Sequence, residues 1–115
     1  MEKLTIYQVP TCTTCRKVIK TLEEAGVDFE AIDYYINPIP KSKLKDLLKK
    51  MGLRARDILR KEVISQELRL IIQKYSDDDL IELMVDYPDL IQRPIVEKGK
   101  KAILARPPER IKEIL

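Results

Sequence analysis

An α/β domain with a mixed β-sheet is the fold class that the sequence predicts, and three observations predict it. Two strand-like runs, Leu4–Tyr7 and Phe29–Tyr34, enclose a helical pattern that begins at Thr13. A long stretch at about residues 41–87 then has helical patterns only. Two further strand-like runs flank Lys98–Lys100, a turn with a central glycine that is typical of a hairpin. The predicted order is therefore βαβ, a helical insertion, and ββα.

The first part of the chain predicts a βαβ unit. Leu4–Tyr7 is rich in β-branched and aromatic residues and stops before Pro10, as a short strand does. Gly26 stands where the following helix would end. The apolar positions of that helix, spaced by three or four residues, are Val18, Ile19 and Leu22. With Phe29–Tyr34 as the second strand, the crossover is expected to be right-handed.

The middle of the chain predicts a helical subdomain, inserted at about residues 41–87 of a single domain that covers residues 1–115. We expect Ser42 to cap a first helix that ends at Gly52. The further helical segments are expected at Ala55–Leu59, at Gln66–Tyr75 and from Ser76–Asp79 onward. The last start is well marked, because a serine accepts free backbone N–H groups while aspartates favour the positive end of the helix dipole.

The last part of the chain predicts two strands and a helix. Ile95–Glu97 and Ala102–Leu104 lie on either side of the glycine turn. Pro107 and Pro108 are suited to the first positions of a terminal helix. The apolar residues of that helix are Ile111, Ile114 and Leu115.

Composition narrows the function classes. A net charge of +3 among many acidic residues gives no reason to expect binding to nucleic acid or a membrane surface. No run reaches the roughly 18 apolar residues that span a bilayer, and no signal peptide precedes the first strand, so we expect a cytoplasmic protein. Two cysteines without any histidine do not complete a zinc site, so no metal is expected.

Cys12 is the predicted reactive group. It falls between the first strand and the first helix, where free N–H groups and the helix dipole lower a cysteine pKa from about 8.5 by one unit or more. Arg16 adds a positive charge one turn along. Cys15 is close enough in sequence to act as a resolving thiol, although it could also be a small apolar residue of the core.

Three arginines, Arg60, Arg93 and Arg106, stand at breaks in the predicted secondary structure. Guanidinium groups bind oxyanions bidentately, so arginines that converge on Cys12 would hold a tetrahedral anion and keep the sulfur ionised. Spacing alone leaves open that they are ordinary solvated arginines. Arg93-Pro94 opens the third strand, where a cis peptide bond can occur.

Nearly the whole chain resembles the arsenate reductase family of the glutaredoxin-coupled type, together with its relatives, the Spx-like regulators. The matching segments are Pro10–Lys17, Asp57–Arg60, Leu90–Val96 and Ala105–Glu109. The resemblance implies a thioredoxin-like fold with a helical insertion and a role in arsenic detoxification. It implies that Cys12 attacks arsenate while Arg60, Arg93 and Arg106 bind the oxyanion. It also implies no bound cofactor, with glutathione and glutaredoxin supplying electrons.

The chain departs from the family pattern at three places. Such reductases usually have another residue where Cys15 stands, so an internal Cys12–Cys15 disulfide recycled by thioredoxin becomes an alternative to glutathione. Many of them have histidine and asparagine where this chain has Gln8 and Val9. A proline-tyrosine pair that such reductases usually have after the first of the three arginines is absent, and Ser65-Gln66 lies nearby instead.

A redox-sensing regulator is the rival hypothesis. Spx-like regulators share the Cys-x-x-Cys pair and the Arg93-Pro94 segment, and they carry a glycine at the position of Gly52 that is associated with binding the RNA polymerase α subunit. Gly52 is also explained as a helix C-cap. The ending Arg106–Glu109 looks more like a reductase. A thiol oxidoreductase with another substrate is the third possibility.

Overall fold

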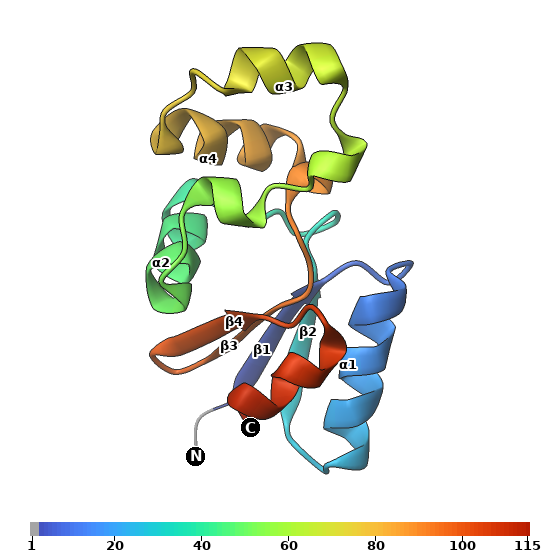
Figure 1. Cartoon of the computed structure of the whole chain (residues 1–115). Coiled ribbons are helices and arrows are strands. Elements are labelled where there is room, and N and C mark those ends of the chain that lie inside the picture. The colour runs from blue at the N-terminus through green and yellow to red at the C-terminus, as the bar shows by residue number, and fades with distance from the viewer. Residues whose placement is uncertain (1–2) are drawn as a thin grey trace.

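The computed structural model describes residues 3–115 and is built on a four-stranded mixed sheet with the strand order β2-β1-β3-β4 (Figure 1). The strands are β1 (Leu4–Gln8), β2 (Phe29–Asp33), β3 (Ile95–Lys98) and β4 (Lys101–Leu104). β1 runs parallel to β2 and antiparallel to β3, and β3 runs antiparallel to β4. The predicted fold class, and the predicted order of elements along the chain, are thereby confirmed.

One face of the sheet is covered by the α-helix α1 (Thr13–Glu24) and the C-terminal 3-10 helix η4 (Pro108–Glu113). Leu4 and Ile6 of β1 project into this layer, because alternate residues of a strand face the same side. Helix α1 ends at Glu24 with Ala25 as its C-cap, and Gly26 follows with a φ of 66°. The predicted terminal helix is present, but in the tighter 3-10 form.

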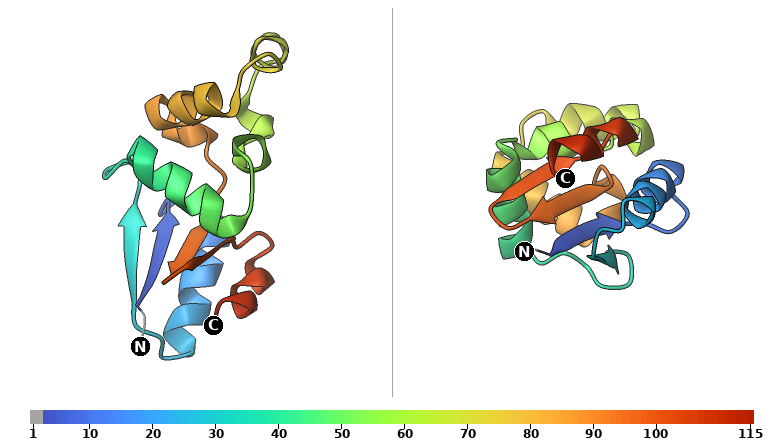
Figure 2. Two further views of the ribbon diagram at one scale, coloured as in Figure 1. Left: turned by 90° about the vertical axis from the view of Figure 1, so that its left-hand side faces the viewer. Right: turned by 90° about the horizontal axis from the view of Figure 1, so that it is seen from below.

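The remaining helices lie on the second face of the sheet and beyond one of its ends, away from Leu115 at the C-terminus (Figures 1 and 2). They are the α-helices α2 (Lys41–Met51), α3 (Gln66–Ile72) and α4 (Asp77–Asp86), and the short 3-10 helices η1 (Ala55–Ile58), η2 (Lys61–Val63) and η3 (Pro88–Leu90). One apolar core runs from Tyr7 and Ile95 of the sheet to Leu44 of α2 and Met84 of α4. The helical segment therefore packs on the second face of the sheet through continuous apolar contact.

The helix starts agree with the sequence in one case and disagree in another. Ser76 caps α4 and forms a capping box with Asp79, as the serine-aspartate pattern predicts. Ser42 was expected to cap α2, and this expectation is wrong because the helix already begins at Lys41. Pro40 holds the N-cap position in an extended conformation, and its carbonyl accepts the first helical hydrogen bond from Leu44.

The carboxylate of Glu97 joins the sheet to α2. Its side chain is only 11% exposed, and it accepts hydrogen bonds from the Tyr7 hydroxyl at 3.0 Å, from Lys43 at 2.7 Å and from Lys50 at 2.5 Å. Burial raises the pKa of Glu97, but these three donors outweigh it and hold the pKa below its usual range. The ionised form is therefore the one that the folded state stabilises.

We expect Glu97→Gln to lower the free energy of unfolding by about 1 to 3 kcal/mol at neutral pH, because charge-assisted hydrogen bonds to two lysines are lost. Since the folded pKa is depressed, Glu97 contributes above its unfolded pKa of about 4.3 and stops contributing as the pH falls through the folded value. Urea unfolding across pH 3 to 8 measures this. Glu113→Gln, at an exposed pair with Arg110, is the control and should change little. An equal loss at pH 3 and pH 7 would contradict the argument.

Candidate active site

Cys12 is the N-cap residue of α1. Its backbone is extended, with φ −80° and ψ 121°, and its Sγ accepts a hydrogen bond from the backbone N–H of Cys15 at 3.3 Å. The half-buried sulfur thus takes the place of the side-chain oxygen that usually caps a helix. The predicted position at the start of the first helix is confirmed.

The two cysteines differ in their affinity for a proton. Burial raises the pKa of the Cys12 thiol, but hydrogen bonds from Cys15 and from Arg93, together with the charge of Arg93, lower it below its ordinary value. Burial raises the pKa of the Cys15 thiol to about 12, and the bond to Cys12 adds to that rise. Cys12 is therefore the sulfur that ionises first, and the Cys15 thiol keeps its proton.

Arg93 lies beside Cys12, and two tyrosines from the end of β2 fix its position. Its side chain is 11% exposed, its guanidinium lies 5.8 Å from the Tyr35 ring centroid, and its Nη1 donates to the Tyr35 hydroxyl at 3.2 Å. Tyr34 packs edge-on against Tyr35 and donates to the carbonyl of Ile91 at 2.9 Å. The Arg93-Pro94 peptide bond is cis, the geometry that the sequence left open.

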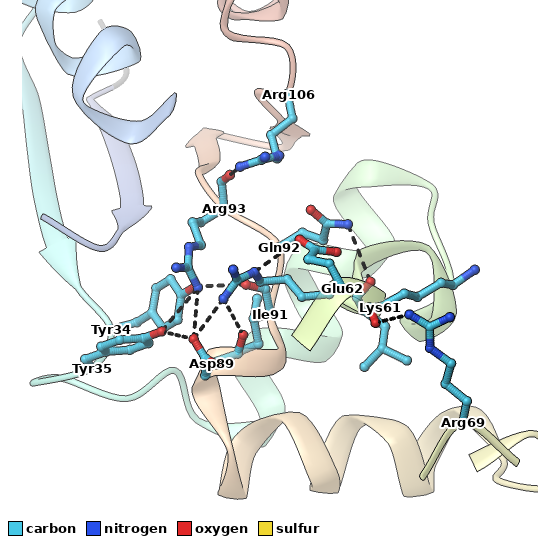
Figure 3. Close-up of polar contacts among 12 residues, drawn as sticks. Tyr34, Tyr35, Lys61, Glu62, Arg69, Asp89, Ile91, Gln92, Arg93 and Arg106 are labelled. Carbon is cyan, nitrogen blue, oxygen red and sulfur yellow. Dashed lines mark hydrogen bonds and ion pairs between the residues drawn. The ribbon is translucent and has the colours of Figure 1, made fainter. Parts of the chain in front are cut away.

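The three predicted arginines form a connected chain, which Figure 3 shows in part. Arg60 Nη1 donates to Asp89 Oδ1 at 2.8 Å, and the same oxygen lies 3.5 Å from Nη1 of Arg93. Arg106 is exposed and donates to the backbone carbonyl of Arg93 at 3.0 Å. Arg60 and Arg93 are therefore bridged by a carboxylate, and Arg106 joins them through the backbone.

Arg16, predicted as a supporting charge, is exposed on α1, and its side chain makes no ion pair or hydrogen bond within residues 3–115. Pro94 is buried behind Arg93, and its carbonyl accepts a hydrogen bond from Ala105 at 2.9 Å. Pro94 thus lies between the Arg93 and Arg106 segments, whereas Arg16 lies outside the arginine chain.

Asp89 and Tyr35 were missed by sequence reasoning. Two signals could have found them: Asp89 stands four residues before Arg93, and Tyr35 follows the second strand. The carboxyl ends of parallel neighbours β1 and β2 lie at one edge of a sheet, so Tyr35 and Cys12 leave the sheet at the same edge.

The side chains of the described residues include no group of three or more metal-binding residues, and no helix there is long and apolar enough to cross a membrane.

A sulfur at a helix start, beside an arginine and at the edge of a mixed sheet, defines a thioredoxin-like thiol protein. Residues 7–114 match the ArsC family, and the chain belongs to that family.

Relatives cover the chain at full length. The chain is 38% identical to an arsenate reductase of Escherichia coli over all of this chain and 82% of the relative. It is 40% identical to the uncharacterized protein YfgD of the same organism, over 99% of this chain and 98% of the relative. The solved structure of an arsenate reductase from Vibrio cholerae superimposes with a TM-score of 0.91 at 36% identity, covering 99% of this chain and 98% of the other.

We expect Arg93→Ala to raise the pKa of Cys12, because a hydrogen bond and a nearby positive charge that stabilise the thiolate are lost. Arg106→Ala should raise it less, since Arg106 binds the backbone of Arg93. Iodoacetamide alkylation rates measured against pH report this pKa. Arg110→Ala, which breaks an exposed pair on η4, is the matched control. Identical pH profiles for Arg93→Ala and the control would contradict the assigned role of Arg93.

Proposed function

We propose that the protein is an arsenate-reductase-like thiol oxidoreductase in which Cys12 is the nucleophile. The observation that carries this proposal is the Cys12 sulfur at the helix start, with a pKa lowered by Cys15 and Arg93. A thiolate, unlike a thiol, attacks an electrophilic centre rapidly. The chain's place in the ArsC family, and relatives named arsenate reductase, support arsenate as the substrate.

In the first step the Cys12 thiolate attacks the arsenic of arsenate. A sulfur-arsenic bond forms, an arsenic-oxygen bond breaks, and the departing oxygen leaves as water after protonation. Arg60, Arg93 and Arg106 would bind the remaining oxygens and neutralise the charge that develops on them. Their connection through Asp89 and the Arg93 carbonyl supports a joint role.

In the second step another thiolate attacks Sγ of Cys12. A disulfide forms, the sulfur-arsenic bond breaks, and its electron pair leaves on arsenic as arsenite. The thiol comes from glutathione, with glutaredoxin reducing the mixed disulfide, or from Cys15, with thioredoxin reducing an internal disulfide. The hydrogen bond from the backbone N–H of Cys15 keeps that residue next to the Cys12 sulfur and favours the internal route, whereas the raised pKa of Cys15 opposes it until that thiol loses its proton. Either route uses the reduced thiol pools of the cytoplasm.

Cys12→Ser is expected to abolish arsenate-dependent NADPH oxidation, because a serine hydroxyl is not ionised at neutral pH and does not attack arsenic. The assay runs in parallel with glutathione plus glutaredoxin and with thioredoxin plus its reductase. Arg110→Ala serves as the control and should keep full activity. Full activity of Cys12→Ser would refute the proposal, and so would capture of the RNA polymerase α subunit with no turnover in either system.

Cys15→Ser separates the two routes. If the internal disulfide is used, turnover with thioredoxin falls to background, because no second cysteine thiol remains within the chain. If glutathione is used, turnover with glutaredoxin persists, altered only by the effect that replacing the Cys15 thiol has on the Cys12 pKa, since the backbone N–H of residue 15 still donates to the Cys12 sulfur. The alkylation profile of Cys12 in the same variant measures that second effect independently.

A further inference from the structure

Asp89 places a negative charge inside a group of residues that is otherwise suited to anions. Its Oδ1 lies 2.8 Å from Nη1 of Arg60 and 3.5 Å from Nη1 of Arg93, and it accepts a hydrogen bond from the Tyr35 hydroxyl. A carboxylate next to two guanidiniums occupies donors that an oxyanion needs and repels its charge. The presence of Asp89 therefore bears on which anions this group of residues accepts.

The carboxylate is held in place. Arg60 binds both the side chain and, at 2.9 Å, the backbone carbonyl of Asp89. The neighbouring backbone is fixed by the hydrogen bond from Arg60 N to the Leu90 carbonyl at 2.7 Å and by that from Gln92 N to the Ile58 carbonyl at 2.8 Å. Asp89 is thus a fixed part of the arginine group (Figure 3).

The second carboxylate oxygen of Asp89 is available as an acceptor. All three side-chain contacts use Oδ1, and within residues 3–115 Oδ2 makes no hydrogen bond or ion pair. The hydrogen bond from Tyr35, and the charges of Arg60 and Arg93, outweigh desolvation and keep the pKa of Asp89 below its ordinary value. An ionised carboxylate only accepts hydrogen bonds, so a bound group meets Oδ2 favourably when it carries a proton to donate.

We propose that Asp89 is a specificity-determining residue that makes the arginine group select tetrahedral oxyanions carrying a proton over those without one. This inference rests on the proposed function, because it assumes that the oxyanion binds to Arg60 and Arg93. Near neutral pH arsenate and phosphate keep at least one O–H group, whereas sulfate keeps none. A protonated oxyanion donates its O–H to Oδ2, while sulfate leaves two negative oxygens facing each other without a proton.

The expected size of the discrimination follows from hydrogen bonding. A site that accepts a ligand O–H through a charged group rejects the analogue without that proton by roughly tenfold to a hundredfold. Asparagine at position 89 keeps the shape but can donate an N–H to sulfate, so the preference should disappear. The aspartate and asparagine side chains differ mainly in charge and in the ability to donate a hydrogen bond.

The test measures dissociation constants of arsenate and sulfate by titration calorimetry at pH 7 and constant ionic strength. The protein carries Cys12→Ser, so that arsenate binds without turnover. We expect this background to bind arsenate at least tenfold more tightly than sulfate, and Asp89→Asn to bring the ratio close to one. Asp78→Asn, at an exposed aspartate paired with Lys41 and Lys45 on another surface, is the control and should keep the ratio.

Three results would overturn this inference. If Asp89→Asn binds arsenate and sulfate more tightly by the same factor, Asp89 repels every anion equally and does not select between them. An unchanged ratio, in a protein whose Cys12 form reduces arsenate, would defeat the role of Asp89 and leave the proposed function standing. Absence of arsenate binding in every variant, together with absence of turnover, would defeat both. Melting temperatures of the two aspartate variants confirm that each is folded.

Discussion

The contact on which the site depends is the hydrogen bond from the N–H of Cys15 to the sulfur of Cys12. It does two things at once, because it satisfies a free donor at the start of α1 and stabilises a negative charge on sulfur. Oxygen would cap a helix equally well, but only sulfur ionises near neutral pH. The start of α1 therefore carries the reactive sulfur. The second residue that stabilises the thiolate, Arg93, comes from a segment about eighty residues further along the chain.

The sheet topology explains how that distant arginine reaches the sulfur. β1 and β3 are antiparallel neighbours in a register that pairs Tyr7 with Ile95, so the segment entering β3 lies beside the segment leaving β1. Cys12 follows β1, and Arg93-Pro94 precedes β3. β2, parallel to β1, ends at the same edge and supplies Tyr35. Three chain segments therefore meet at one edge as a direct result of strand order.

Much of this could be predicted from sequence, and the failures have physical causes. The strands, the hairpin and the Ser76 cap follow from local patterns, and Cys12 follows from its place between a strand and a helix. The spacing of Asp89 from Arg93 is a sequence signal, but the contact of Asp89 with Arg60 could not be found in this way, because it is a tertiary contact. The prediction that Ser42 caps α2 failed because Pro40, two residues earlier, holds the N-cap position. Its backbone is extended, and its carbonyl accepts the first helical hydrogen bond.

The helical insertion is part of the site because of one backbone bridge. Leu59 pairs with Ile91 in an isolated antiparallel bridge, which places Arg60 opposite the segment that carries Asp89 and Arg93. Helix α2 is held on the sheet by Glu97 and by the shared apolar core. A shift of the insertion relative to the sheet would therefore change how Arg60 and Asp89 lie against Arg93. The charge around Cys12 thus depends on how the insertion packs, although within residues 3–115 no residue of α2 makes a hydrogen bond or ion pair with the arginine chain.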